Sequence, residues 1–218
     1  MIFQARRIDG MMAESNERCS VMKKGLAAVG LMLVITAATW ALSTPANPIP
    51  RLFEVAQLCG ALALTGFAAG LIIATRLTAV NALFTDGHKL TTVHKWTGIV
   101  SVCLVLVHIG LLVYVTVAED VPPLTSMLAH IGPLAATCFV VLAIVALVGA
   151  KMKHSTWLAI HKFMAVPYVI GLVHYYGCSF FKPLGFTPLS IWMDLLTLAG
   201  LSAAVYGIFL RHPLSRNS

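Results

Sequence analysis

Six long apolar stretches constrain this chain more than any other feature of its sequence. Each holds about 20 residues or more, the length that an α-helix needs to cross the hydrocarbon core of a bilayer. The mean hydropathy of +0.88 and the charged fraction of 11% are those of a membrane protein rather than a soluble domain. We therefore predict an all-α, polytopic membrane bundle of six transmembrane helices, at residues 25–44, 52–75, 93–117, 127–150, 157–177 and 187–210.

Proline, glycine and short polar runs separate these stretches, as expected of loops. The chain then divides into an N-terminal tail at 1–24, the six-helix domain at 25–210 and a short tail at 211–218. Residues 23–46 could alternatively be a signal peptide, although their apolar run is longer than a usual h-region. The five cysteines lie far apart without a CxxC pair, which indicates neither a disulfide framework nor a zinc site.

Lysine and arginine gather on one side of the predicted bundle. Thirteen of the fifteen basic residues fall on the side that holds both chain ends, and only Arg51 and Lys182 fall on the other. Because positive residues mark the cytoplasmic side, we expect both termini in the cytoplasm. The basic residues do not cluster on one polar face, so the net charge of +7 does not indicate nucleic-acid binding.

Four of the eight histidines lie within two predicted helices, where ionisable residues are costly and are functional candidates by default. His94 and His108 are fourteen residues apart in the third helix, and His161 and His174 are thirteen apart in the fifth. At about 1.5 Å per residue, the two histidines of each helix stand roughly 20 Å apart along its axis. The third and fifth helices run in the same direction, so we expect His94 level with His161 and His108 level with His174.

Two levels of paired imidazoles suit two stacked b-type haems with bis-histidine ligation. Four small residues leave room for flat macrocycles between the helices: Gly98, Gly110, Ala165 and Gly171. A lone intramembrane histidine is more often a hydrogen-bond partner of a neighbouring helix than a cofactor ligand. Two pairs of histidines at matching depth are much less expected by chance. Zinc is a weaker alternative, because His94 and His108 are too far apart to share one ion.

The helical phase is less favourable in the fifth helix than in the third. Fourteen residues return to within about 40° of the starting face, whereas thirteen fall about 140° short of four turns. Pro167 lies between His161 and His174 and predicts a local distortion of this helix. The sequence does not fix the face to which that distortion turns His174.

The histidine motifs resemble the ferric reductase-like transmembrane domain, over about residues 50–212. The resemblance rests on the four spaced histidines and on the runs Asp86-Gly87-His88-Lys89-Leu90, His94-Lys95-Trp96-Thr97-Gly98 and Ser155-Thr156-Trp157. It implies six helices, an inner haem held by His94 and His161, and an outer haem held by His108 and His174. The superfamily includes ferric-chelate reductases, NADPH oxidases and the haem subunit of the methionine sulfoxide reductase system. Similarity to its bacterial members implies the inner membrane of a bacterium.

Many members of that superfamily continue into flavin- and nicotinamide-binding domains after the sixth helix. Only seven residues follow Arg211 here, and no GxGxxG loop occurs. The resemblance therefore implies that FAD and NAD(P)H act through a cytoplasmic flavoprotein reductase, in another domain or protein. A ferric chelate is the expected acceptor on the outer face, with dioxygen or a periplasmic redox protein as alternatives. A quinol-oxidising dihaem cytochrome b and a non-redox transporter or assembly protein are the rival interpretations.

Three basic residues at the cytoplasmic boundary are further candidates for cofactor binding: Arg76, Lys95 and Lys162. They could pair with the anionic haem propionates, although ordinary anchoring by snorkelling explains them equally well. Arg51 and Lys182 could do the same on the outer side. The other four histidines are expected in surface or interfacial roles: His88, His130, His154 and His212.

Overall fold

The structure is a computed structural model, and it describes residues 24–43, 51–84, 87–118, 127–179 and 186–210. Every element in this part of the chain is helical. The elements are an N-terminal helix Lys24–Ser43, α2 Arg51–Thr75, α3 Thr78–Asn81, α4 Gly87–Ala118, α5 Met127–Val148, η1 Gly149–Lys151, α6 His154–Lys162, α7 Ala165–Ser179, α8 Pro188–Val205 and η2 Tyr206–Leu210. The tail at 211–218, and that at 1–24 except for Lys24, lie outside the described residues.

Six helical segments are long and apolar enough to cross a membrane, which confirms the predicted number of spans. The fifth span, His154–Cys178, consists of α6 and most of α7, and the sixth, Pro188–Phe209, consists of α8 with most of η2. Helix α4 begins six residues before the predicted start at 93 and has 32 residues. A helix of that length measures about 48 Å and exceeds the hydrocarbon thickness, so part of it extends beyond the apolar layer.

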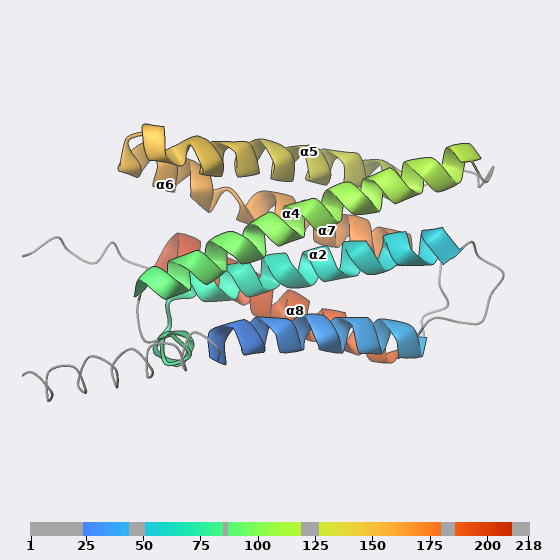
Figure 1. Ribbon diagram of the computed structural model, residues 1–218, viewed down its shortest axis with the longest axis horizontal. Helices are drawn as coiled ribbons and strands as arrows, with labels where there is room; N and C mark the ends of the chain where they lie inside the picture. Colours follow the sequence, from blue (N-terminus) through green and yellow to red (C-terminus); the bar gives the residue numbers. More distant parts are fainter. Residues whose placement is uncertain (1–23, 44–50, 85–86, 119–126, 180–185, 211–218) are drawn as a thin grey trace, which may run out of the picture.

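Helix α2 is the central helix of the bundle (Figure 1). Within the described residues, 67% of its apolar window is buried, compared with 11–28% for the other spans. It packs mainly against α4 and α8, and it also touches α7. Small residues make this close packing possible, because alanine and glycine let helix backbones approach one another. Buried examples on α2 are Ala56, Ala61, Ala63, Gly66, Ala68, Ala69 and Gly70.

Aromatic and polar contacts join the remaining helices to α2. The rings of Phe67 on α2 and Phe139 on α5 stack with centroids 3.8 Å apart. Thr36 on the N-terminal helix shares a 2.8 Å hydrogen bond with Thr65 on α2 and accepts another at 2.8 Å from the Trp192 indole on α8. These contacts fix the neighbours of α2, while many large apolar side chains face outward, as a lipid-exposed surface requires.

The two ends of the bundle differ in charge. Seven described basic residues lie at one end, which we call the basic end: Lys24, Arg76, Lys89, Lys95, Lys151, Lys153 and Lys162. Arg51 begins α2 at the opposite end. In Figure 1 the basic end is on the left, where α6 folds back under the end of α5.

Candidate functional site

The structure brings the four intramembrane histidines together in two pairs. His94 on α4 and His161 on α6 have ring centroids 5.8 Å apart, with the ring planes at 80°. His108 on α4 and His174 on α7 have centroids 6.5 Å apart, with the planes at 73°. The first pair lies toward the basic end and the second toward the opposite end, as the parallel course of the third and fifth spans predicts.

A break in the fifth span brings both of its histidines to face α4. Helix α6 ends at Lys162 and α7 begins at Ala165, with Pro167 in the first turn of α7. Across the break the Phe163 N–H donates to the Ile160 carbonyl, and the Met164 N–H donates to the His161 carbonyl. These tighter contacts replace α-helical ones just before a proline, which would clash with a regular turn there. The break resets the helical phase and so removes the 140° mismatch.

Carbonyl groups of α2 orient the two histidines of α4. His94 Nδ1 lies 3.1 Å from the Gly70 carbonyl oxygen, and His108 Nδ1 lies 2.7 Å from the Ala56 carbonyl oxygen. Because a carbonyl only accepts, each Nδ1 carries the proton and donates it. In each ring the other nitrogen, Nε2, is then left with a free lone pair, which is the form of histidine that binds a metal.

The two histidines of the fifth span are held differently. His174 Nδ1 lies 3.6 Å from the Cys178 sulfur, one turn further along α7. His161 Nδ1 is buried and has no hydrogen-bond partner among the described residues. The His161 ring instead stacks on the Trp157 indole, with centroids 4.9 Å apart and an interplanar angle of 12°.

Two glycines, Gly60 and Gly132, make space for the imidazoles, and a third, Gly70, lies at ordinary contact distance from one. A Cβ atom added at Gly60 would lie 3.1 Å from His108 Nδ1, and one at Gly132 would lie 2.6 Å from the His174 ring. A Cβ at Gly70 would lie 3.9 Å from His94 Nδ1. At Gly98 and Gly110, which the sequence analysis singled out, an added Cβ would meet nothing within 4 Å. The close approaches therefore occur on the neighbouring helices α2 and α5.

A cavity of about 440 Å³ lies between α2, α4, α5 and α7 and includes both His108 and His174 in its wall. The wall is otherwise mainly apolar, with Phe67, Phe139 and Gly171 among its residues. A space of this kind accepts a flat apolar group that both imidazoles can reach.

The ring separations test whether these donors suit a metal with two axial positions. A histidine nitrogen lies about 2 Å from a bound metal and the ring centre about 1 Å behind it, so two axial imidazoles have centroids about 6 Å apart. The observed 5.8 and 6.5 Å fit that arrangement. No group of three or more His, Cys, Asp or Glu side chains that could hold a metal ion occurs among the described residues, which disfavours a tetrahedral zinc site there.

The predicted cationic residues at the basic end are exposed. Arg76 follows the last residue of α2, contacts Thr91 at 3.5 Å and is close enough to His94 for electrostatic interaction. Its φ of 52° is in the left-handed region, and its carbonyl accepts a 2.8 Å hydrogen bond from Asn81. Lys95 and Lys162 follow His94 and His161 directly in sequence, whereas Lys182 lies outside the described residues.

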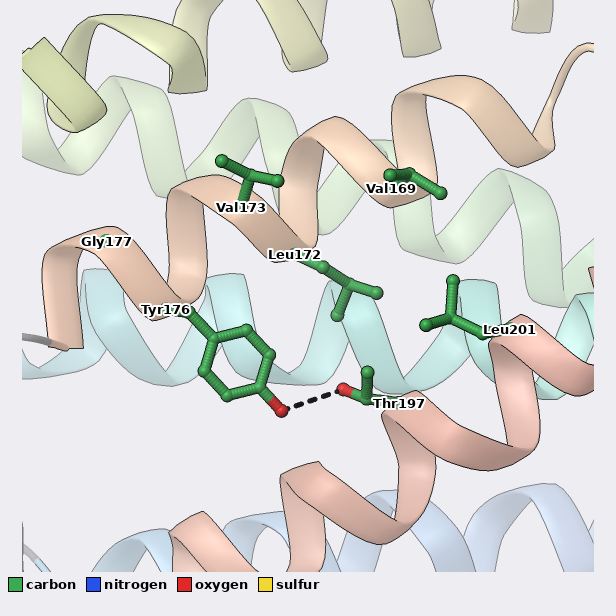
Figure 2. A pocket seen from close by; sticks show the side chains of 7 residues that line it. All are labelled: Val169, Leu172, Val173, Tyr176, Gly177, Thr197 and Leu201. Carbon is green, nitrogen blue, oxygen red and sulfur yellow. Dashed lines mark hydrogen bonds between the residues drawn. The ribbon is translucent and has the colours of Figure 1, made fainter.

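A polar cluster that the sequence analysis missed lies between α7 and α8. The Tyr176 hydroxyl donates to Asp194 at 2.6 Å. It also contacts the Thr197 hydroxyl at 3.1 Å (Figure 2). A cavity of about 440 Å³ adjoins it and is lined mainly by apolar side chains, including Val169, Leu172 and Leu201. Asp194 is an acidic residue within an apolar span, a signal that the sequence already contained.

A bundle of membrane helices that carries imidazole pairs at two levels is typical of membrane proteins that transfer electrons through bound metal cofactors. The family model described as the ferric reductase like transmembrane component matches residues 59–172, about half of the chain. The protein belongs to this family, whose members typically bind haem and whose membership implies an oxidoreductase membrane component for transmembrane electron transfer. The match includes His94, His108 and His161 and ends two residues before His174. No curated protein matches the chain. A non-redox transporter or assembly protein is not what this family implies.

Backbone strain at Arg76 gives a first prediction. Arg76→Gly should have a free energy of unfolding about 1 kcal/mol higher than Arg76→Ala, because glycine adopts a positive φ without a Cβ clash. Both variants lose the guanidinium, so the difference isolates the backbone. Reversible unfolding in mixed detergent micelles measures it, and equal stabilities would show that the left-handed residue is unstrained.

Proposed function

We propose that this protein transfers electrons across a bacterial inner membrane through two b-type haems, from a cytoplasmic flavin and NAD(P)H donor in another domain or protein to an acceptor outside. One observation carries the proposal: two imidazole pairs stand at two levels of an apolar bundle, each with a spacing that suits two axial ligands. His94 and His161 would hold the haem nearer the basic end, and His108 and His174 the other. Family membership supports the electron-transfer function.

The chain's own residues would perform three tasks in this function. The α2 carbonyls fix the ring orientations of His94 and His108, so that each Nε2 faces the cofactor. The apolar walls exclude water and raise the barrier to ions. Arg76, Lys95 and Lys162 supply positive charge at the basic end, where propionate groups need partners. When bound, haem iron supplies a one-electron redox couple at each level.

The excess of basic residues at one end supports a cytoplasmic location for that end and for both termini. Electrons would then enter near His94 and His161 and leave near His108 and His174. His108 and His174 would hold the haem that supplies this electron, and the acceptor would take it without binding between the two histidines. We favour a ferric chelate as that acceptor on family grounds, with dioxygen and a periplasmic redox protein as alternatives.

Single alanine substitutions at the four histidines test the ligand assignment. His94→Ala and His161→Ala should each remove the same haem, and His108→Ala and His174→Ala the other, so haem per chain falls from two to about one. Reduced-minus-oxidised optical spectra and haem-to-protein ratios measure this. His154→Ala, at an exposed histidine on the same helix as His161, is the matched control and should keep both haems. A dithionite-reduced wild-type protein without b-type bands would refute the proposal.

A glycine pair tests the same assignment without removing a ligand. Gly132→Ala should lower haem content at the His108–His174 level, because the new methyl group overlaps the His174 ring. Gly30→Ala is the control, since Gly30 lies on the N-terminal helix, which carries none of the four histidines, and nothing lies within 4 Å of its added Cβ. The measurement is again the haem-to-protein ratio, together with the spectrum of the haem that remains. A wild-type ratio and spectrum in Gly132→Ala would contradict the assignment of His174.

The Tyr176–Asp194 cluster favours a second candidate donor, a membrane quinol. The quinol's hydroxyl group could donate to the Asp194 carboxylate, and the quinol's isoprenoid tail could lie along the apolar cavity between α7 and α8. Tyr176 follows His174 by two residues, so the two side chains leave α7 about 200° apart. A quinol there would be separated from the His108–His174 level only by α7.

The Asp194→Asn substitution decides between the two donors. If the quinol is the donor, decylubiquinol should reduce the wild-type haems, and Asp194→Asn should slow this reaction about tenfold, because the carboxylate that accepts the quinol proton is lost. Reduction by a photoreduced flavodoxin should be unchanged in the same variant. If decylubiquinol reduces both proteins equally, or neither, this cavity is not a quinol site.

A further inference from the structure

A stack of three aromatic rings runs along α6 from the surface of the basic end to the His94–His161 pair. His154 and Trp157 have ring centroids 5.7 Å apart at 26°, and Trp157 and His161 have centroids 4.9 Å apart at 12°. His154 is exposed, Trp157 is half-buried, and the Nδ1 atom of His161 is buried. Positions 154, 157 and 161 share one face of the helix, so the stack spans about 10 Å along the axis.

Trp157 is confined on both of its sides. Its indole covers Gly149 of η1, where an added Cβ would overlap the ring, and it also stacks on the His154 and His161 imidazoles. His94, His108 and His174 each have a hydrogen-bonding or sulfur contact at Nδ1, whereas His161 has none among the described residues. Stacking on Trp157 therefore fixes the ring orientation of His161, as the contacts at Nδ1 do for the other three histidines.

The surface around the exposed end of this stack is positively charged. Lys151, Lys153 and Lys162 flank it on η1, the intervening turn and α6, and all three are exposed. The two acidic side chains among the described residues, Glu54 and Asp194, both lie in the other half of the bundle. A partner with an acidic surface is complementary to this corner, and long-range attraction would steer it there.

We propose that this corner, η1 with α6, is the electron-uptake site: an acidic flavoprotein docks on its lysines, and Trp157 links the surface to His161. The inference rests on the proposed function and adds the place of uptake and the residue that mediates it. His94 and His161 would hold the haem that accepts one electron at a time, and the donor flavin would supply each electron. Trp157 keeps its oxidation state and provides electronic contact between the two, while also fixing the plane of the His161 ring.

Trp157 variants test the contact in the haem-loaded full chain. Photoreduced flavodoxin serves as the acidic flavoprotein, and dithionite as a small reductant that needs no docking. Trp157→Leu should slow reduction by flavodoxin about tenfold relative to reduction by dithionite, whereas Trp157→Phe, which keeps a ring, should stay near wild type. The low-spin electron paramagnetic resonance signal of the haem held by His161 should shift in Trp157→Leu alone. Trp96→Leu is the control, at an exposed tryptophan of α4.

Charge reversal tests the docking surface without touching a histidine. Lys151→Glu/Lys153→Glu should slow reduction by flavodoxin about tenfold at low salt and flatten its salt dependence. Lys24→Glu, on the N-terminal helix across the basic end, should have little effect (Figure 1). If Trp157→Leu loses haem, this lysine pair still decides the proposal.

The outcomes separate this inference from the proposed function. A wild-type chain without haem refutes both. A chain that binds two haems, but whose reduction by flavodoxin is unaltered by the Trp157→Leu or the double lysine substitution, refutes the uptake site alone.

Discussion

Imidazole nitrogens placed in hydrocarbon need partners, and the rest of this bundle is arranged around that requirement. Helix α2 meets it for α4, because its carbonyls at Gly70 and Ala56 accept hydrogen bonds from His94 and His108. A helical carbonyl has a second lone pair, so it can accept this bond without giving up its place in the helix. The approach needs a helix that is nearly free of bulk on that face, which explains why glycine and alanine dominate the buried side of α2.

Patterns along one segment could be predicted from the sequence, whereas contacts between segments could not. The six spans follow from apolar length and the levels of the four histidines from helix direction, because both depend on a count of residues. The position of Pro167 indicated a distortion, but the turn at Phe163 and Met164 that redirects His174 depends on packing against α5. The spacing glycines Gly60 and Gly132 lie on helices that carry no histidine of either pair, so no periodicity on α4 or α7 points to them.

The four histidines differ in the contacts of their Nδ1 atoms, and the contacts at the basic end differ from those at the opposite end. Toward the opposite end, His108 bonds a carbonyl and His174 contacts a sulfur atom within its own helix. Toward the basic end, His94 bonds a carbonyl while His161 relies on an aromatic face. A bond at Nδ1 raises the basicity of the other ring nitrogen, so His161 should be the weakest donor of the four. The cationic Arg76 lies near this pair as well. Weaker donation and nearby positive charge would both favour the reduced state of a metal held by this pair. Under the proposed function they would ease electron uptake and oppose onward transfer to the other pair.

Between the two histidine levels the bundle contains aromatic and aliphatic side chains. Phe67 lies between Gly70 and Gly60 along α2, and it stacks on Phe139 of α5. Around them pack Ala63, Tyr168 and Leu172, which are buried. An ion entering this layer would lose its hydration without finding replacement ligands, and the penalty for an unpaired charge in such surroundings is many kcal/mol. An electron carries no hydration shell and needs only redox centres close enough on either side. The same apolar packing that holds the helices together therefore blocks ions while leaving a path for electrons. The two histidine pairs are the places where this apolar packing is interrupted by polar groups.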